Sequence, residues 1–350
     1  MFRNPMKKIL FSATALVAVV SLVLAGCGDD NDSESADSSD KPLIVVTTNI
    51  LGDVVTNMVG DSFDVETIMP PGSDPHDFQA SAQQVQTMMS ADLLIVNGAN
   101  FEEGMLDVIE NAESDGVMIF EATSVISQLE GSDDHSDHGG HDDHDEEKDH
   151  DDHEGHDHDE EKDHDDHEGH DHGGIDPHFF TDPARMAIVA QELSEFLAAN
   201  FPDADQGFVS TANDYVQQLQ DLDSEVEDTL SVISSDKRLL VTNHAVFAYF
   251  ADRYSFTILG EIIPGSSTLA SASAQQLASL AEEIKESQVK AIFADASSSD
   301  ALAQTLADEV NDVKVINLYT ESLGDPGSSG DSYIDMIRFN AEAIASALVE

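Results

Sequence analysis

The sequence predicts an α/β protein with two lobes, each built on a mostly parallel sheet, joined by a long rigid helix. Short apolar runs of strand length alternate with helical patterns from residue 43 to residue 120 and again from residue 238 onward. Such alternation is typical of βα units. Between the two series lies a helical pattern over residues 203–234. A helix of that length, about 45 Å, is long enough to be shared by two lobes.

The first lobe is expected over residues 42–200. Its expected strands are residues 43–48, 63–69, 92–97 and 117–120. Its expected helices are residues 50–61, 81–91, 101–112 and 183–199. Pro70, Pro71 and Gly72 end the second strand, because proline cannot donate to a sheet ladder and both residue types favour turns.

The second lobe is expected over residues 235–350. Its expected strands are residues 238–243, 255–260, 289–294 and 313–318. Its expected helices are residues 244–254, 274–287, 300–310 and a last one from about Tyr333. The linking pattern at 203–234 carries an apolar stripe with alternating spacings of three and four, which predicts a helix with one buried face. The stripe is Phe208, Tyr215, Leu219, Leu222, Val226 and Leu230.

A stretch rich in histidine and aspartate, residues 131–174, interrupts the first lobe and contains no apolar side chain. Residues 145–158 are repeated without change at 159–172. This composition cannot bury enough surface to offset the entropy of ordering, so we expect a disordered insertion. Imidazole with carboxylate suits divalent transition metals, which favours weak metal binding in a scavenging, buffering or sensing role. A solvated acidic linker is the alternative. The twelve histidines are His135, His138, His141, His144, His150, His153, His156, His158, His164, His167, His170 and His172.

The first 26 residues have the pattern of a secretory leader, with basic residues ahead of an apolar run at 9–25. A transmembrane anchor is the alternative, but the run is short. The following Leu-Ala-Gly-Cys, ending at Cys27, resembles the bacterial lipobox, in which the cysteine is lipidated after cleavage. Cys27 is the only cysteine, which excludes disulfides and thiolate metal sites. We therefore expect a lipid anchor at Cys27, a flexible tether to residue 41, and a protein held at the membrane outside the cytoplasm.

The chain is strongly acidic, with a formal net charge of −57. Such a surface repels phosphate backbones, so the composition argues against nucleic-acid binding. A saline habitat is one explanation of an acidity that extends beyond the insertion.

Three histidines lie outside the insertion, namely His76, His178 and His244. Taken singly, each would more often be a structural histidine than a ligand. However, His76 and His244 follow expected strands, and ligands of open α/β sheets bind beyond the carboxyl ends of strands. His178 stands in a second Asp-Pro-His, and Glu321 follows the last expected strand. Three imidazoles and one carboxylate suit zinc, whereas manganese prefers more oxygen.

These motifs resemble those of the solute-binding proteins of bacterial zinc and manganese ABC importers, from about Leu43 to Ala347. The resemblance is carried by PGSDPHDFQAS, ADLLIVNGANFEEGM, DPHFFTDP, HAVFAYFADRY, IIPGSS, KAIFAD and TESLGDPGSSGDSYIDMIRFN. It implies a metal held in the cleft between two α/β lobes, with His76, His178 and His244 as ligands and Glu321 in place of the acidic fourth ligand.

The resemblance also bears on the choice of metal. Manganese members usually have a carboxylate at the position of His244, and zinc members have a His-rich insertion before the second Asp-Pro-His. Both features imply Zn²⁺ as the transported ligand, with Mn²⁺ less favoured.

Four positions depart from the family pattern. Phe179 and Phe180 follow the second Asp-Pro-His, where a tryptophan is common in the family. The Glu-Pro-Ser that usually follows the IIPGSS region appears here as Ala272-Ser273. Asp295 stands where a glutamate is common, and we expect it behind the ligands or in a structural role. Glu321 is one methylene longer than the commoner aspartate, so water or another carboxylate remains an alternative fourth ligand.

The sequence therefore predicts the zinc-capturing component of an ABC importer, a monomer that delivers its ion to a permease driven by an ATPase. One alternative is a manganese- or iron-binding member of the same family. Another is a surface metal store or adhesin, in which case truncating 131–174 would abolish metal uptake, whereas the importer would retain one tight site. An enzyme is not expected, because the sequence has no HExxH, nucleophile elbow or P-loop.

Overall fold

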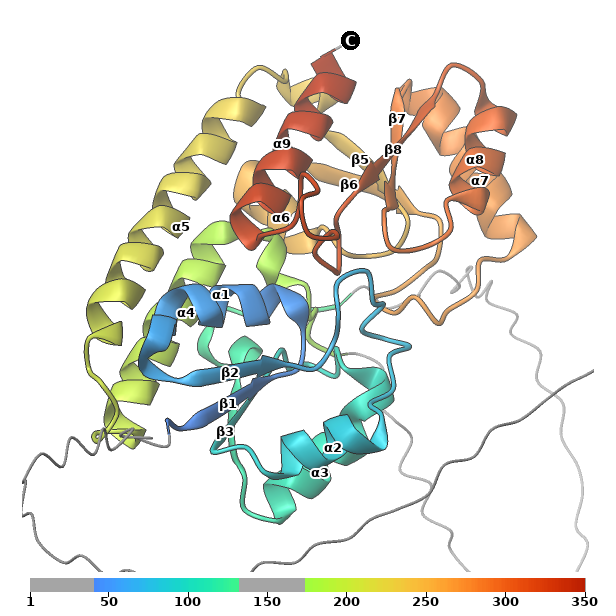
Figure 1. Ribbon diagram of the computed structural model, residues 1–350. Helices are drawn as coiled ribbons and strands as arrows, with labels where there is room; N and C mark the ends of the chain where they lie inside the picture. Colours follow the sequence, from blue (N-terminus) through green and yellow to red (C-terminus); the bar gives the residue numbers. More distant parts are fainter. Residues whose placement is uncertain (1–40, 132–173, 350) are drawn as a thin grey trace, which may run out of the picture. The chain divides into compact units, whose positions relative to one another are not determined.

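The computed structural model describes residues 41–131 and 174–349, which contain two four-stranded sheets (Figure 1). Every strand pair in both sheets is parallel, which confirms the α/β class and the two-lobe architecture. The expected leader, the lipidation site Cys27, the tether and the twelve clustered histidines lie outside the described residues. Within residues 41–131 and 174–349, we find no helix with the length and apolar character needed to span a membrane.

The first sheet has the strand order β2-β1-β3-β4. Its strands are β1 (Leu43–Val46), β2 (Asp64–Thr67), β3 (Leu93–Val96) and β4 (Met118–Glu121). Side chains alternate between its faces, so that Ile44 and Val46 join one core cluster and Val45 joins another. Burial on both faces explains why the central strands read as continuous apolar runs.

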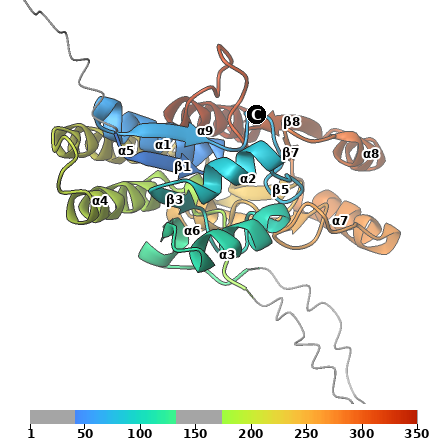
Figure 2. The ribbon, with the colours of Figure 1, turned by 60° about the horizontal axis from the view of Figure 1, so that its bottom comes forward.

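Helices cover both faces of this sheet (Figure 2). They are α1 (Asn49–Val59), α2 (Ala82–Met89), α3 (Leu106–Ser114) and α4 (Pro183–Asn200). Met88 of α2 and Ala112 of α3 pack with Val45, whereas α1 and α4 pack on the opposite face. Capping at Thr48, Ser81 and Asp182 begins three of the helices, because each side chain accepts from a backbone N–H of the first turn.

The second sheet repeats this plan with the strand order β6-β5-β7-β8. Its strands are β5 (Leu239–Thr242), β6 (Thr257–Glu261), β7 (Ala291–Asp295) and β8 (Lys314–Leu318). Its helices are α6 (Ala248–Tyr254), α7 (Ala274–Ser287), α8 (Ala301–Val310) and α9 (Tyr333–Val349). Helices α7 and α8 share one hydrophobic cluster on one face of this sheet, and α6 and α9 belong to the cluster on its other face.

A single helix, α5 (Phe208–Leu230), packs against both lobes. It contacts α1 and α4 of the first lobe and α9 of the second. All six residues of the predicted apolar stripe are buried. With 23 residues, α5 is about 35 Å long, and the predicted shared helix is therefore present.

The prediction of helix throughout residues 203–234 is wrong at both ends. Before the helix, the Asp205 carboxylate accepts a hydrogen bond from the Gly207 N–H, which holds a turn. After it, the Arg238 guanidinium donates to the carbonyls of Leu230 and Ile233. A basic side chain that satisfies terminal carbonyls stabilises a helix end, and it ends α5 here.

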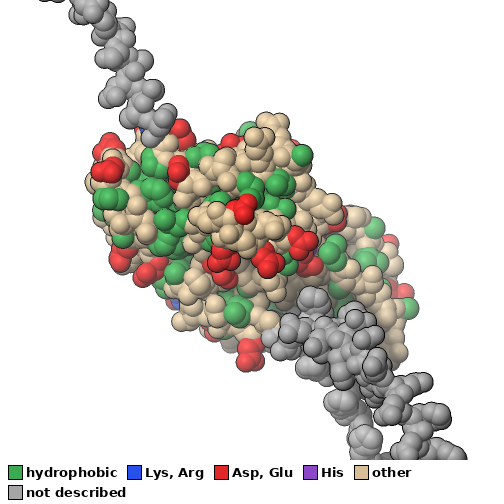
Figure 3. All heavy atoms as spheres, turned by 90° about the horizontal axis from the view of Figure 1, so that it is seen from below, with side chains coloured by type: hydrophobic (Ala, Val, Ile, Leu, Met, Phe, Trp, Pro, Cys, Tyr) green, Lys and Arg blue, Asp and Glu red, His purple; other side chains and the backbone are tan. Residues whose placement is uncertain are grey.

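The described surface is acidic, as the net charge requires. On the face shown in Figure 3, groups of carboxylate side chains are scattered among hydrophobic and neutral ones, and basic side chains are scarcely seen. A field of this sign attracts cations and accelerates their encounter with the protein.

Candidate metal site

Four side chains from four separate segments meet in one buried cluster, namely His76, His178, His244 and Glu321. One ligand atom of each lies within 4.8 Å of the others, and each residue is at most 2% exposed. His76 lies in the loop after β2, His244 follows β5 and Glu321 follows β8. The carboxyl ends of parallel strands thus bring three of them together, as in other open α/β sheets.

The cluster is organised around one carboxylate oxygen. Oε1 of Glu321 lies 2.8 Å from Nε2 of His76, 3.3 Å from Nε2 of His178 and 2.9 Å from Nε2 of His244. Zinc ligands at about 2.0–2.1 Å in a tetrahedron are about 3.3–3.4 Å apart. The three Nε2 atoms therefore lie about as far from Oε1 as two ligands of one zinc ion lie from each other.

The sequence prediction of a helix from residue 244 is wrong, and the difference serves the site. Helix α6 begins only at Ala248. His244 lies in an irregular loop whose backbone is satisfied elsewhere: its carbonyl accepts from the Thr242 hydroxyl at 2.8 Å, and the Ala245 N–H donates to the Gly265 carbonyl at 3.0 Å. The loop lets the imidazole turn toward Glu321 instead of following a helical face.

The two histidines of the first lobe each have a carboxylate behind them. Nδ1 of His76 lies 2.9 Å from Oε1 of Glu103, and Nδ1 of His178 lies 2.9 Å from Oδ1 of Asp176. The Asp176 carboxylate also accepts from the His178 backbone N–H at 2.8 Å. Such partners fix the ring orientation and the tautomer, leaving Nε2 for a metal.

The second lobe leaves its two groups less constrained. Nδ1 of His244 and Oε2 of Glu321 are buried with no hydrogen-bond partner among the described residues. Buried polar atoms are normally paired, so each of these two atoms is still able to form a further interaction.

The four residues carry strong mutual electrostatic effects. Burial alone would lower the pKa of His76, but hydrogen bonds with Glu103 and Glu321 outweigh it and raise the pKa to about 10. Burial also opposes charge on His178, and Asp176 and Glu321 again raise its pKa. Burial would raise the pKa of Glu321, but the three imidazoles hold it well below its ordinary value. The cluster therefore carries protons that a metal ion would have to displace.

A loop of the first lobe, residues 97–102, seals the cluster from one side. The Phe101 ring packs edge-on against His76 at 5.1 Å and His178 at 5.4 Å between centroids. Glu102 is fully buried and accepts hydrogen bonds from the Thr47 hydroxyl at 2.6 Å and the Asn97 N–H at 2.7 Å. This carboxylate holds the loop in place, so that an aromatic ring excludes water from two candidate ligands.

Two asparagines hold the segment that carries Glu321. The Asn340 amide bonds the N–H and the carbonyl of Tyr319, at 3.0 and 2.6 Å. From the first lobe, Asn49 accepts from the Leu323 N–H and donates to the Ser322 hydroxyl, each at 2.8 Å. The chain on both sides of Glu321 is therefore held, once from each lobe, while Oε2 of its side chain stays without a partner among the described residues.

Asp295 lies outside the cluster of four. It is buried at the end of β7, and its carboxylate accepts from the Ser297 N–H at 3.0 Å and the Ser297 hydroxyl at 2.5 Å. Burial and the charge of Glu321 raise its pKa. The sequence reasoning missed Glu103 and Asp176 as partners of the histidines. The Asp-Pro-His motif contained a signal for Asp176, whereas nothing separated Glu103 from its acidic neighbours.

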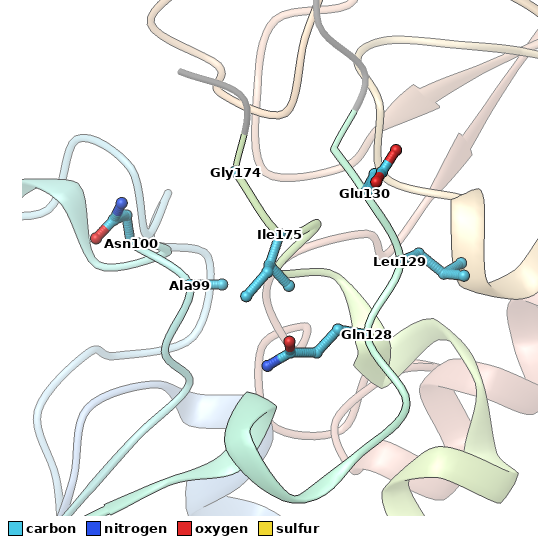
Figure 4. Close-up of a pocket in the computed structure, with 7 residues that line it drawn as sticks. All are labelled: Ala99, Asn100, Gln128, Leu129, Glu130, Gly174 and Ile175. Carbon is cyan, nitrogen blue, oxygen red and sulfur yellow. The ribbon is translucent and has the colours of Figure 1, made fainter. Parts of the chain in front are cut away.

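A pocket of about 460 Å³ lies beside the point where residues 132–173 leave the described chain (Figure 4). None of the four clustered residues lines it. Its lining is Ala99, Asn100, Gln128, Leu129, Glu130, Gly174 and Ile175.

Comparisons with known proteins identify the family of the chain. The family profile described as "ZnuA: Zinc-uptake complex component A periplasmic" matches residues 44–347. The chain is 26% identical to the manganese ABC transporter substrate-binding lipoprotein PsaA of Streptococcus anginosus, over 98% of this chain and 99% of that protein. It is 25% identical to the manganese-binding lipoprotein MntA of Halalkalibacterium halodurans, with the same coverage.

Solved structures show the same fold. The periplasmic zinc binding protein TroA from Treponema pallidum is 25% identical and superposes with a TM-score of 0.70, covering 89% of this chain and 100% of that one. The Mn-bound periplasmic metal binding protein from Candidatus Liberibacter asiaticus gives a TM-score of 0.69 at 21% identity, covering 88% and 100%.

Proposed function

Because the chain belongs to the family of periplasmic zinc-uptake complex A components, the solute-binding proteins of metal ABC importers, we propose that it captures Zn²⁺ outside the cytoplasm and delivers it to a membrane permease. The observation that supports this most is the approach of three imidazole Nε2 atoms to one oxygen of Glu321. The proposed ligands are His76, His178, His244 and Glu321. Asp295 is not a proposed ligand; it acts on Glu321 electrostatically.

The donor set favours zinc over manganese. Three neutral imidazoles and one carboxylate form a tetrahedral set typical of Zn²⁺, whereas Mn²⁺ prefers more oxygen donors and a higher coordination number. Manganese is the second candidate, because relatives of this chain carry manganese in their names. His244 is the residue on which the choice depends, since its replacement by a carboxylate would give two nitrogen and two oxygen donors.

Metal competition on the intact chain and on the His244→Glu variant tests the proposed metal. We expect the wild-type protein to bind Zn²⁺ at least about a hundredfold more tightly than Mn²⁺, and the variant to lose most of this preference. Tighter binding of Mn²⁺ by the wild-type protein would make manganese the cargo while leaving the site unchanged.

Substrate-binding proteins of ABC transporters work with a permease and an ATPase, and this family is one of transporters rather than of enzymes. We propose a monomer anchored by lipid on Cys27, with residues 28–41 as the tether. The anchor would keep the binding protein close to its permease, and more than one acyl chain is needed for durable retention. Mass spectrometry of the membrane fraction should show the lipid on Cys27, and Cys27→Ser should release the protein from that fraction.

A further inference from the structure

The two chain segments that flank residues 132–173 form a short paired stem. Glu130 and Ile175 form an antiparallel bridge. The Asp176 N–H donates to the Leu129 carbonyl at 2.9 Å, and the Gly131 N–H donates to the Gly174 carbonyl at 2.8 Å. In Figure 4 these segments run side by side. We call residues 128–131 and 174–176 the stem; it ends two residues before His178.

The hydroxyl group of Tyr249 lies between the two sides of the stem. It accepts a hydrogen bond from the Leu129 N–H at 3.0 Å and donates one to the Asp176 carbonyl at 2.9 Å. Tyr249 is fully buried in α6, a helix of the opposite lobe that begins four residues after His244. One hydroxyl group therefore connects α6 with both sides of the stem.

A guanidinium group holds the Tyr249 ring in place. The Arg185 group lies 4.8 Å from the centroid of the ring, a distance typical of a cation–π contact. Arg185 also forms ion pairs with Asp182 and Asp252 and donates to the Ser127 carbonyl beside the stem. Because the ring is fixed by packing and charge, its hydroxyl group is a rigid support and not an adaptable contact.

We propose that Tyr249 is a positioning residue for metal binding, which acts on His178 through Asp176. The inference rests on the proposed function of the four-residue site. Asp176 uses its carbonyl to accept from Tyr249 and its carboxylate to hold both the backbone and Nδ1 of His178. Loss of the hydroxyl removes the support of Asp176 and of Leu129 at once, and the His178 ring loses its fixed direction. The stem of the insertion and the metal site are thus one hydrogen-bonded unit.

The substitution Tyr249→Phe in the full chain tests this role, because it removes the hydroxyl and keeps the ring under Arg185. Tyr254→Phe is the matched control: it lies in the same helix and loses a hydroxyl bonded to Asp223 at 3.0 Å, away from the stem. Loss of a residue that hydrogen-bonds a metal-binding histidine typically lowers metal affinity about 10–100-fold. Since Tyr249 acts one step further out, we expect zinc affinity to fall about tenfold in Tyr249→Phe and within about twofold in Tyr254→Phe.

Cobalt serves as a spectroscopic probe of the same site. We expect the visible absorption bands of bound Co²⁺ to change in Tyr249→Phe and to be unchanged in Tyr254→Phe. In an Asp176→Ala background, Tyr249→Phe should have little further effect on zinc affinity, because two residues that act through one path are not additive.

Three results would overturn the inference. They are an unchanged affinity and spectrum in Tyr249→Phe, an equal loss in both tyrosine variants, and a full additional loss in the Asp176→Ala background. A wild-type chain that binds zinc no more tightly than its His76→Ala variant would instead overturn the proposed function, and the inference with it.

Discussion

The two lobes contribute to the cluster in different ways. In the first lobe, His76 and His178 each have a carboxylate on the far side of the ring, Glu103 and Asp176 respectively. In the second lobe, Nδ1 of His244 and Oε2 of Glu321 have no partner among residues 41–131 and 174–349. The first lobe therefore presents two oriented ligands, and the second presents two that can still adjust.

This difference indicates that the two lobes have different roles in metal binding. Oriented imidazoles lower the entropic cost of binding because their rings are already placed. Groups without partners can move to complete the coordination shell, and their movement is coupled to the lobe that carries them. We expect the first lobe to set affinity and the second lobe to respond to the ion, which makes the following substitutions informative.

The largest effect is expected from His76→Ala, which removes an oriented ligand. Zinc affinity should fall by more than about a hundredfold, the upper range for loss of an outer partner. Isothermal titration in competition with a chelator measures this change. An affinity within tenfold of the wild-type value would remove His76 from the site.

A smaller loss is expected from Glu103→Ala, which leaves all four ligands but frees the His76 ring. Affinity should fall about 10–100-fold. The matched control is Asp107→Ala, an exposed acidic residue in the first turn of the nearby helix α3. Equal behaviour of the two variants would show that Glu103 acts only through the overall charge.

The pH dependence of zinc binding is expected to follow the protons on the first-lobe histidines. The pKa of His76 is raised to about 10, so its ring is protonated at neutral pH in the metal-free cluster, and the pKa of His178 is raised in the same direction by Asp176 and Glu321. Zinc must displace these protons, so affinity should rise with pH and approach a plateau near pH 10. Calorimetry in buffers of different ionisation enthalpy should detect release of at least about one proton at pH 7, the one on His76. Binding independent of pH between 6 and 8 would contradict histidine ligation.

The smallest effect concerns the stability of the metal-free protein. The pKa of His76 is raised from its ordinary 6.5 to about 10, so protonated His76 stabilises the fold fully below pH 6.5 and progressively less up to about pH 10. The pKa of Glu321 is lowered, so its contribution is present above its ordinary value of 4.5 and lost in stronger acid. The melting temperature should therefore decline between pH 6.5 and 10, with a shallower slope in His76→Gln. Identical slopes in thermal scans would show that the shift of the His76 pKa is absent.

The sequence was sufficient to predict most of the fold. The strand-like runs of the sequence placed all eight strands to within two residues, including β2, which is mostly exposed. It could not predict the ends of α5 or the starts of α3 and α6. The ends of α5 depend on side-chain contacts with the backbone, from Asp205 and Arg238, and the loop before α6 depends on the carbonyl of Gly265.

The four clustered residues were predictable for a geometric reason. Loops at the carboxyl ends of parallel strands meet at one edge, so three scarce histidines and Glu321 were expected near each other. Glu103 and Tyr249 were not predictable, because they reach the site through packing between segments that are separated in the sequence. Asp74 and Asp176 occupy the same place in two Asp-Pro-His motifs, yet only Asp176 contacts the Nδ1 of its histidine. Only the fold distinguishes these two aspartates.

We propose that the scattered histidines, and not the twelve clustered ones, form the tight zinc site. The most direct test is zinc stoichiometry and affinity of the wild-type chain, of a chain lacking residues 132–173 and of His76→Ala. The paired ends Gly131 and Gly174 allow this deletion to be closed by a short turn. We predict that the deletion keeps one tight zinc ion and that His76→Ala loses it. Loss of tight binding on deletion, with tight binding kept in His76→Ala, would place the tight zinc site in residues 132–173.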